Sequence, residues 1–299
     1  MLRHNFLSHL FHHRMATTSS FIMITGASTG IGLAVTTELV RRGHAVFAGV
    51  RKQADADRLR AELGEGCIPL LLDVTNAETI RSAVVTVQQH LQGRGLQCLI
   101  NNAGIAHGGP LQHIPIESIR QDFEVNVLGL IAVTQAILPF LGARASHEGK
   151  PGRIINISSV GGKISPPFIA PYVATKHAVE GLSHSLRREL RVFGIDVVIV
   201  GPGGVNTPIW DKVDDVEQFH DTAYYEPLKK FTENFIASGK KGLTMETIGR
   251  QIADIVEVPK PKIRYALVRN RVPNWIIPRL LPNGILDKII GGALGLTKK

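Results

Sequence analysis

The stretch FIMITGASTGIGLAVTTELVRRG, residues 21–43, is the strongest indication of the fold of this chain. FIMITG is a short apolar run that ends in glycine, which predicts a buried strand. GLAVTTELVRRG has apolar residues at helical spacing and ends on Gly43, a common helix stop. A strand that passes through a glycine-rich turn into a helix is the opening unit of an open parallel α/β sheet.

The turn between them, TGASTGIG at residues 25–32, has the composition of a phosphate-binding loop. Gly26 allows a tight turn, Gly30 lets the backbone approach a pyrophosphate, and Gly32 permits close packing of helix on strand. The helix N-terminus offers free N–H groups and the positive end of its dipole to an anion. The sequence therefore predicts a dinucleotide phosphate site at this turn.

The same alternation of apolar runs and helical segments continues to about residue 258. We expect strands at 45–51, 68–74, 97–104, 153–159 and 196–203, and helices at 53–64, 77–91, 116–141, 172–193 and 245–257. Strands this uniformly apolar are buried on both faces, as parallel strands between helices must be. The predicted fold class is α/β: a single-domain Rossmann fold, a doubly wound parallel sheet flanked by helices, with a helical substrate lid and an extended C-terminal tail.

The chain divides into three segments on this basis. Residues 1–18 are basic and acid-free, and we expect a disordered extension or a targeting peptide. Residues 19–258 are the expected catalytic domain, in which about 208–242 follow a strand and would hang over the ligand crevice as a lid. Residues 259–299 are a basic and apolar extension that we expect to pack on the substrate side.

Net charge is +9, and the excess lies at the two ends. Residues 258–299 hold nine Lys or Arg side chains against the single Asp287. No nucleic-acid-binding motif accompanies them, so we predict no nucleic-acid partner. A solvated surface explains the basic tail, and contact with an anionic membrane surface is the alternative. Cys67 and Cys98 lack metal-type spacing and are expected to be free core thiols, and no metal site is predicted.

The glycine turn resembles the TGxxxGxG motif of the short-chain dehydrogenase/reductase family. Further motifs of that family follow in its order over about residues 20–255: Asp73, NNAG at 101–104, Asn126, NISS at 156–159, YxxxK at 172–176 and PGG at 202–204. The tail segments IRYALV, RLLP and LDKII loosely resemble the retinol, 17β-hydroxysteroid and 3-hydroxybutyrate dehydrogenase branch.

The resemblance implies a nicotinamide dinucleotide. Its contacts would come from Gly26, Ser28, Thr29, Gly30, Ile31, Gly32, Arg51, Asp73, Val74, Asn101, Ala103, Gly104, Tyr172, Lys176, Pro202, Gly203, Val205 and Thr207. Family members that use NAD place an acid where this chain has Val50, and Arg51 follows it, suited to a 2′-phosphate. We therefore expect NADP(H), with NAD(H) as the alternative if Arg51 is only a solvated surface side chain.

Catalysis by this family's chemistry needs an acid/base for the substrate oxygen. Tyr172 lies one helical turn before Lys176, whose charge would favour the phenolate and lower the tyrosine pKa from about 10. Taken alone, the pair is better explained as two amphipathic side chains on a helix. By resemblance, Ser159 holds the substrate oxygen, with Ser158 as second choice, and Asn126 steadies a water in the proton relay. A buried asparagine satisfied within its helix is the alternative for Asn126.

The expected function is interconversion of an alcohol and a ketone or aldehyde on an apolar substrate such as a retinoid, steroid or lipid. Substrate contacts are predicted for Ser159, Val160, Phe168, Tyr172 and Trp210. An NAD(H)-dependent alcohol or hydroxy-acid dehydrogenase is the nearest alternative. A non-enzymatic NADP-binding sensor is disfavoured, because such proteins typically lose the tyrosine or lysine. The resemblance further implies a homodimer or homotetramer, and we expect an intracellular protein, cytoplasmic or peripheral to a membrane, or one targeted to mitochondria or elsewhere by residues 1–18.

Overall fold

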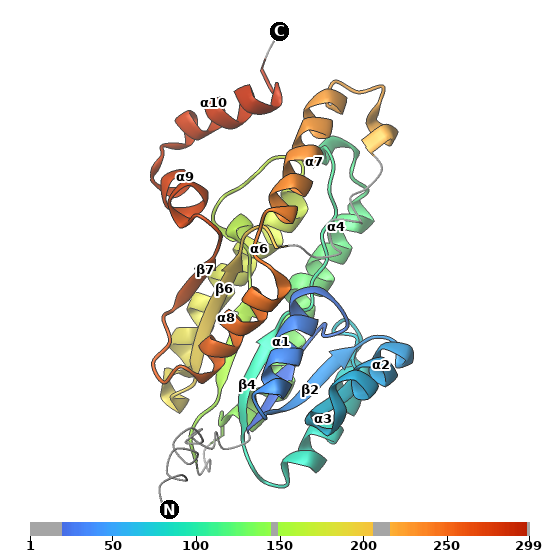
Figure 1. The fold of residues 1–299 in the computed structure, drawn as a ribbon, viewed down its shortest axis with the longest axis vertical. Coiled ribbons are helices and arrows are strands. Elements are labelled where there is room, and N and C mark those ends of the chain that lie inside the picture. Colours follow the sequence, from blue (N-terminus) through green and yellow to red (C-terminus); the bar gives the residue numbers. More distant parts are fainter. Residues whose placement is uncertain (1–19, 145–148, 206–215, 298–299) are drawn as a thin grey trace, which may run out of the picture.

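A parallel seven-stranded sheet forms the centre of the molecule (Figure 1). The computed structural model describes residues 20–144, 149–205 and 216–297. The strand order is β3-β2-β1-β4-β5-β6-β7, with every neighbouring pair parallel. The strands are β1 (Phe21–Ile24), β2 (Ala45–Val50), β3 (Cys67–Leu71), β4 (Leu96–Asn101), β5 (Arg153–Ile157), β6 (Asp196–Pro202) and β7 (Arg264–Leu267). The order reverses between β1 and β4, where open α/β sheets bind their ligands.

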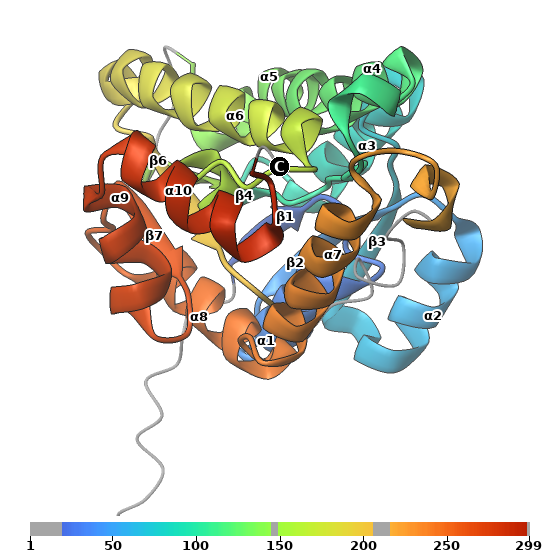
Figure 2. The ribbon, with the colours of Figure 1, turned by 90° about the horizontal axis from the view of Figure 1, so that it is seen from above.

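Helices cover both faces of the sheet (Figure 2). One face carries α1 (Gly30–Arg41), α2 (Gln53–Leu63) and α8 (Met245–Glu257), whose apolar side chains share one buried cluster with the strands. The other carries α3 (Ala77–Leu91), α5 (Leu130–Ile137) and α6 (Ala170–Glu189), packed in a second cluster. The predicted single α/β domain with a doubly wound sheet is confirmed.

The helical run at 116–141 is continuous but not uniform. It comprises α4 (Ile116–Phe123), a π-helical turn (Glu124–Gly129), α5 and a 3-10 turn (Leu138–Leu141). By length and composition alone this run could cross a membrane. In the fold, however, its residues Val133, Ile137 and Leu141 are buried against the sheet. The π-helical turn was not predicted from the sequence, because a local change of helical period leaves no mark in the apolar pattern.

The lid and the C-terminal extension gather beyond the carboxyl ends of the strands (Figure 1). Within the predicted lid, a 3-10 turn (Val216–Phe219) and α7 (Tyr225–Lys240) lie in the described residues. After β7 come a π-helical turn (Val272–Ile276), α9 (Ile277–Leu280) and α10 (Asn283–Leu294). Leu294 and Ile290 of α10 pack in a cluster with Phe168 and Leu228. The boundary at residue 258 stays a prediction, and residues 1–18 lie outside the described part.

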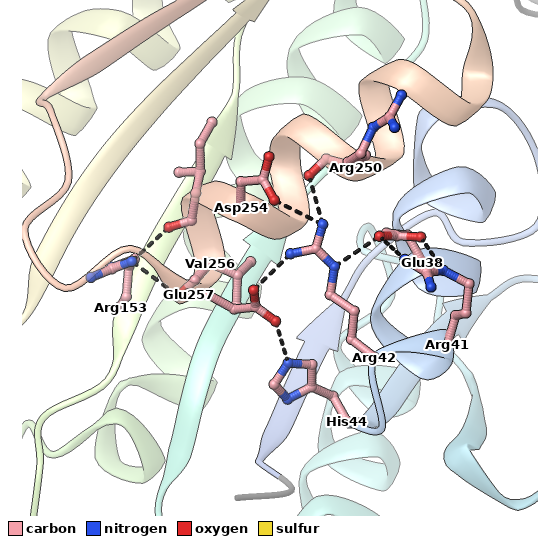
Figure 3. Close-up of polar contacts among 10 residues, drawn as sticks. Glu38, Arg41, Arg42, His44, Arg153, Arg250, Asp254, Val256 and Glu257 are labelled. Carbon is pink, nitrogen blue, oxygen red and sulfur yellow. Dashed lines mark hydrogen bonds and ion pairs between the residues drawn. The ribbon is translucent and has the colours of Figure 1, made fainter. Parts of the chain in front are cut away.

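A charged network fastens α1 to α8 (Figure 3). Arg42 donates to Glu38 at 2.8 Å, to Asp254 at 2.8 Å and to Glu257 at 2.6 Å. His44 contacts the second oxygen of Glu257 at 3.0 Å. Beside this network, Arg153 of β5 donates to the carbonyl oxygen of Val256 (Figure 3). It also donates to the carbonyl oxygens of Ile255 and Val258, which satisfies the C-terminal end of α8. The helix that follows the lid, α8, is therefore bound to α1 along its length and to β5 at its C-terminal end.

Candidate active site

A cavity of about 560 Å³ opens at the carboxyl ends of the strands. One half is lined by glycines and polar groups from the ends of β1, β2 and β4, and the other by apolar side chains from the 160–169 loop and α7. Ser159, Tyr172 and Lys176 line the cavity. Such a cavity suits an elongated ligand in the polar half and a second, apolar ligand in the other half.

The glycine turn forms the wall of the polar half. Gly26 and Gly30 have φ of +67° and +58°, a region that side chains with a Cβ disfavour. A Cβ on Gly32 would collide with the Gly26 carbonyl oxygen, so Gly32 is required for the helix to approach the strand. Gly26, Ser28, Thr29, Gly30 and Ile31 line the cavity, whereas Gly32 lies behind it.

The second asparagine of NNAG, not the first, holds this turn. Asn102 donates from Nδ2 to the carbonyl oxygens of Thr25 at 2.9 Å and Gly26 at 3.0 Å. Asn101 is buried and donates instead to Thr134 and Asn156, both at 2.9 Å. It therefore does not line the cavity, contrary to the prediction. Strand alternation gives the reason: adjacent side chains point to opposite sides of the backbone, and Asn101 points into the helix layer. Ala103 and Gly104 line the cavity as expected.

The far end of the polar half carries basic and acidic groups. Arg51, Asp73 and Val74 line it as expected, and so do Lys52 and Asp55, which sequence reasoning did not single out. The basic pair Arg51–Lys52 directly before a helix was the signal that could have identified Lys52. This end therefore presents two cations to a ligand.

Ser159, Tyr172 and Lys176 meet at the junction of the two halves. Lys176 Nζ lies 5.5 Å from the centre of the Tyr172 ring and donates to the Ile157 carbonyl oxygen at 2.9 Å. The Ser159 hydroxyl accepts from the Gly161 N–H at 3.0 Å, and its interaction with the Tyr172 side chain lowers the pKa of that phenol. The neighbouring Ser158 also lines the cavity, with a buried hydroxyl. The helical spacing of Tyr172 and Lys176 therefore places both on the cavity face of α6.

Burial dominates the protonation of this group. Desolvation raises the pKa of Tyr172; the Ser159 hydrogen bond lowers it, and the negative charge of Asp122 raises it further. Desolvation lowers the pKa of Lys176 to about 8, against the opposing effect of Asp122. The expected lowering of the Tyr172 pKa is thus wrong for this arrangement, because the lost hydration of the phenolate is the largest cause of its shift. Tyr172 holds its proton and can donate it.

Asn126 lies on the π-helical turn behind Gly104 and is buried. Its Oδ1 accepts from the Ile105 N–H at 2.9 Å, and its Nδ2 donates to the Ile105 oxygen at 2.9 Å and to Thr175 at 3.0 Å. These bonds join the loop after β4 to α6, next to Lys176. The side chain is satisfied by two other segments of the chain rather than within its helix, and its role toward a water stays a prediction.

The apolar half is built from phenylalanine and aliphatic side chains. Val160 and Phe168 line it as expected, and Phe231, Phe235 and Leu228 of α7 were missed. The 228, 231 and 235 spacing of apolar residues on a helix was the available signal. Pro202, Gly203 and Val205 line the cavity, while Thr207 and Trp210 lie outside the described residues. Across the described ranges, no three His, Cys, Asp or Glu side chains are grouped so that they could hold a metal.

An open parallel sheet with a glycine turn and a polar cavity at its switch point defines a nucleotide-binding α/β protein. The short chain dehydrogenase family matches residues 20–218. The NADPH-dependent 3-dehydrocapnine reductase of Ornithobacterium rhinotracheale is 36% identical over 271 residues, covering 90% of this chain and 95% of that protein. Mouse retinol dehydrogenase 16 is 34% identical over 227 residues, covering 75% and 69%.

Among solved structures, a short-chain dehydrogenase from Streptomyces avermitilis superposes with a TM-score of 0.73 at 27% identity, covering 92% of this chain and 94% of that one. The chain belongs to the short-chain dehydrogenase family of oxidoreductases.

Proposed function

We propose that this protein is an NADP(H)-dependent oxidoreductase that interconverts an alcohol and a ketone or aldehyde on an apolar, retinoid-, steroid- or lipid-like substrate. The observation that carries the proposal is the position of Tyr172, Lys176 and Ser159. They lie where the glycine-lined half of the cavity meets the phenylalanine-lined half. A hydride acceptor and its donor would have to meet at this junction.

The residues fit a nicotinamide dinucleotide. Positive φ at Gly26 and Gly30 brings bare backbone to the cavity, where a pyrophosphate would approach the N-terminus of α1. Asp73 and Val74 would hold the adenine end, and Pro202, Gly203 and Val205 the nicotinamide end. When bound, the nicotinamide supplies or accepts the hydride.

The chain's own groups would handle the proton. In the reductive direction, Ser159 donates a hydrogen bond to the substrate carbonyl oxygen and orients it against Tyr172. Tyr172 gives its proton to that oxygen as it becomes a hydroxyl. Lys176, as an ammonium, stabilises the phenolate left on Tyr172. In the oxidative direction the same groups act in reverse, and the phenolate takes the hydroxyl proton.

Cofactor choice rests on the end of β2. Arg51 and Lys52 line the cavity there, and Val50 stands where an acid would select NAD(H). The similar reductase that is named NADPH-dependent supports the same choice. An NAD(H)-dependent alcohol or hydroxy-acid dehydrogenase is the second candidate. A sensor without activity is disfavoured because the serine, tyrosine and lysine lie together.

The substrate class rests on the apolar half. Phe168, Phe231 and Phe235 form a run of aromatic contacts at 5.6 and 5.1 Å between ring centres. Such a wall favours an extended apolar ligand. The similarity to a retinol dehydrogenase agrees with this class without selecting one compound.

The test is a panel of apolar alcohols and carbonyls with NADPH and NADH, run on the protein and on Tyr172→Phe. We expect turnover with NADPH and a loss of about 10²- to 10⁴-fold in kcat in the variant, as for removal of a general acid. Tyr265→Phe is the matched control, because the Tyr265 hydroxyl accepts from the Lys262 N–H away from the cavity. Equal rates in Tyr172→Phe and Tyr265→Phe would refute the mechanism.

We also propose that the protein forms a homodimer or homotetramer and lies inside the cell, cytoplasmic or at a membrane surface. The exposed apolar side chains Ile116, Phe123 and Leu128 on the α4 run support self-association. Light scattering of the protein and of Leu128→Lys checks this. An unchanged monomeric mass for both would contradict it.

A further inference from the structure

We infer that Arg264, clamped by Glu180 and Trp275, is a positioning residue for Ser159, so that the C-terminal extension forms part of the catalytic apparatus. This inference rests on the proposed function, because it concerns the residue proposed to hold the substrate oxygen. It extends that function to a segment distant in sequence, whose side chains do not line the cavity within the described residues.

Arg264 binds the main chain of Ser159 directly. Its Nη2 donates to the Ser159 carbonyl oxygen at 3.1 Å. The Gly162 N–H donates to the same oxygen at 3.1 Å, and the Ser159 hydroxyl is fixed by the Gly161 N–H. Ser159 lies beyond the end of β5, where the ladder no longer holds it. Its position toward Tyr172 therefore depends on these few bonds.

Glu180 orients Arg264 from α6. The guanidinium donates from Nε to both carboxylate oxygens at 3.0 Å, and Nη2 lies 2.9 Å from Oε1. Glu180 is 1% exposed, so the pair is shielded from solvent. Tyr172, Lys176 and Glu180 follow each other at intervals of four residues on one face of α6. The proposed acid and the anchor of Arg264 thus share one rigid element.

Trp275 fixes the plane of the guanidinium. Its ring lies 4.2 Å from Arg264 Cζ and 4.5 Å from Arg279 Cζ, and it is 5% exposed. A planar guanidinium stacks on an indole while its edge nitrogens stay free for hydrogen bonds. A Cβ at Gly201 would collide with Arg264, so the glycine at the end of β6 makes the passage of this side chain possible. The path from the extension to Ser159 therefore runs through Trp275 and Arg264.

The roles can be separated by double mutation. Arg264→Lys keeps a positive charge beside Glu180 but cannot bind Glu180 and the Ser159 oxygen in one plane. We expect kcat to fall about tenfold or more with NADPH affinity unchanged, since small displacements of reacting groups are costly in rate. Ser159→Ala should lose about 10²- to 10³-fold. In the Ser159→Ala background, Arg264→Lys should cost less than about threefold, because its effect passes through Ser159.

Trp275→Leu is the second variant, because it leaves the Arg264–Glu180 pair intact. It should lower kcat in the same direction, and this loss should also vanish in the Ser159→Ala background. Arg269→Lys is the control: Arg269 donates to the Lys241 oxygen at 3.0 Å, on the same extension but apart from Ser159. Its kcat should be unchanged.

Additive losses in the double mutants would overturn the inference, as would unchanged kcat in both Arg264→Lys and Trp275→Leu. Neither result touches the proposed function, which fails instead if the unmutated protein shows no turnover or if Ser159→Ala retains full activity. Thermal midpoints of every variant identify loss of folding.

Discussion

At the residue scale, the acid/base pair makes pH the most direct probe. Burial lowers the pKa of Lys176 to about 8, so its ammonium releases a proton at a lower pH than an ordinary lysine does. Tyr172 keeps its proton over the same range, because burial raises its pKa. For carbonyl reduction, kcat/KM should be level below about pH 8 and fall above it as Lys176 becomes neutral. Lys176→Arg, which does not titrate, should lack this break. A break that persists in the variant would assign it to another group.

Arg51 is the second residue whose role can be measured alone. Its side chain is exposed and lines the polar half of the cavity beside Lys52. Arg51→Asp places a carboxylate where it would repel a 2′-phosphate and could accept from ribose hydroxyls. The ratio of kcat/KM for NADPH to that for NADH should fall by about tenfold or more, since charge-assisted bonds of this kind contribute about 1.5–3 kcal/mol. An unchanged ratio would leave Lys52 as the group that reads the phosphate.

At the scale of elements, the joint between α1 and α8 can be tested through its contribution to stability. Arg42 bridges three carboxylates and has a side chain only 16% exposed. Arg42→Met should lower the free energy of unfolding by about 2 kcal/mol, between the values for exposed and buried ion pairs. Urea denaturation followed by circular dichroism measures this. Arg250→Met, an exposed neighbour on α8, should change it by less than about 0.5 kcal/mol. Equal midpoints for the two variants would show that the network adds no stability.

At the scale of the whole molecule, we propose that the C-terminal extension docks on an anionic lipid surface. Seven of the sixteen exposed large apolar side chains in the described residues fall within 272–296: Val272, Ile276, Ile277, Leu280, Ile285, Ile289 and Leu296. Exposed basic side chains at Arg269, Arg271, Arg279 and Lys288 accompany them, and charge complementarity favours anionic headgroups. Leu294 on the inner face of α10 packs with Phe168 and Phe219 of the cavity wall. Docking would bring the apolar half of the cavity close to lipid.

Vesicle sedimentation tests this docking with the full chain. Vesicles that contain phosphatidylserine should retain the protein, and purely zwitterionic vesicles should retain much less. Leu280→Gln with Ile289→Gln should weaken retention, whereas Leu111→Gln with Val192→Gln, exposed elsewhere on the surface, should not. Equal retention of both double variants would refute this role of the extension. A mass without lipid that falls only in the Leu280→Gln, Ile289→Gln variant would make a second copy the partner of the extension.

The fold class and most of the residues of the site could be predicted from the sequence, because their signals are local. Continuous apolar runs, helical segments of period 3.6 and the turn glycines act over a few residues, so the βα alternation and the Tyr172–Lys176 spacing can be read locally. The face of a strand residue and the phase of a long helix depend on distant partners. Three features therefore became visible only in the folded chain. Asn102, not Asn101, contacts the glycine turn, Asn126 lies on a π-helical turn, and Phe231 lines the cavity. It also decided protonation: the raised pKa of Tyr172 comes from desolvation by segments far apart in the chain, which no spacing encodes. The contact of Arg264 with Ser159 across 105 residues is of the same kind.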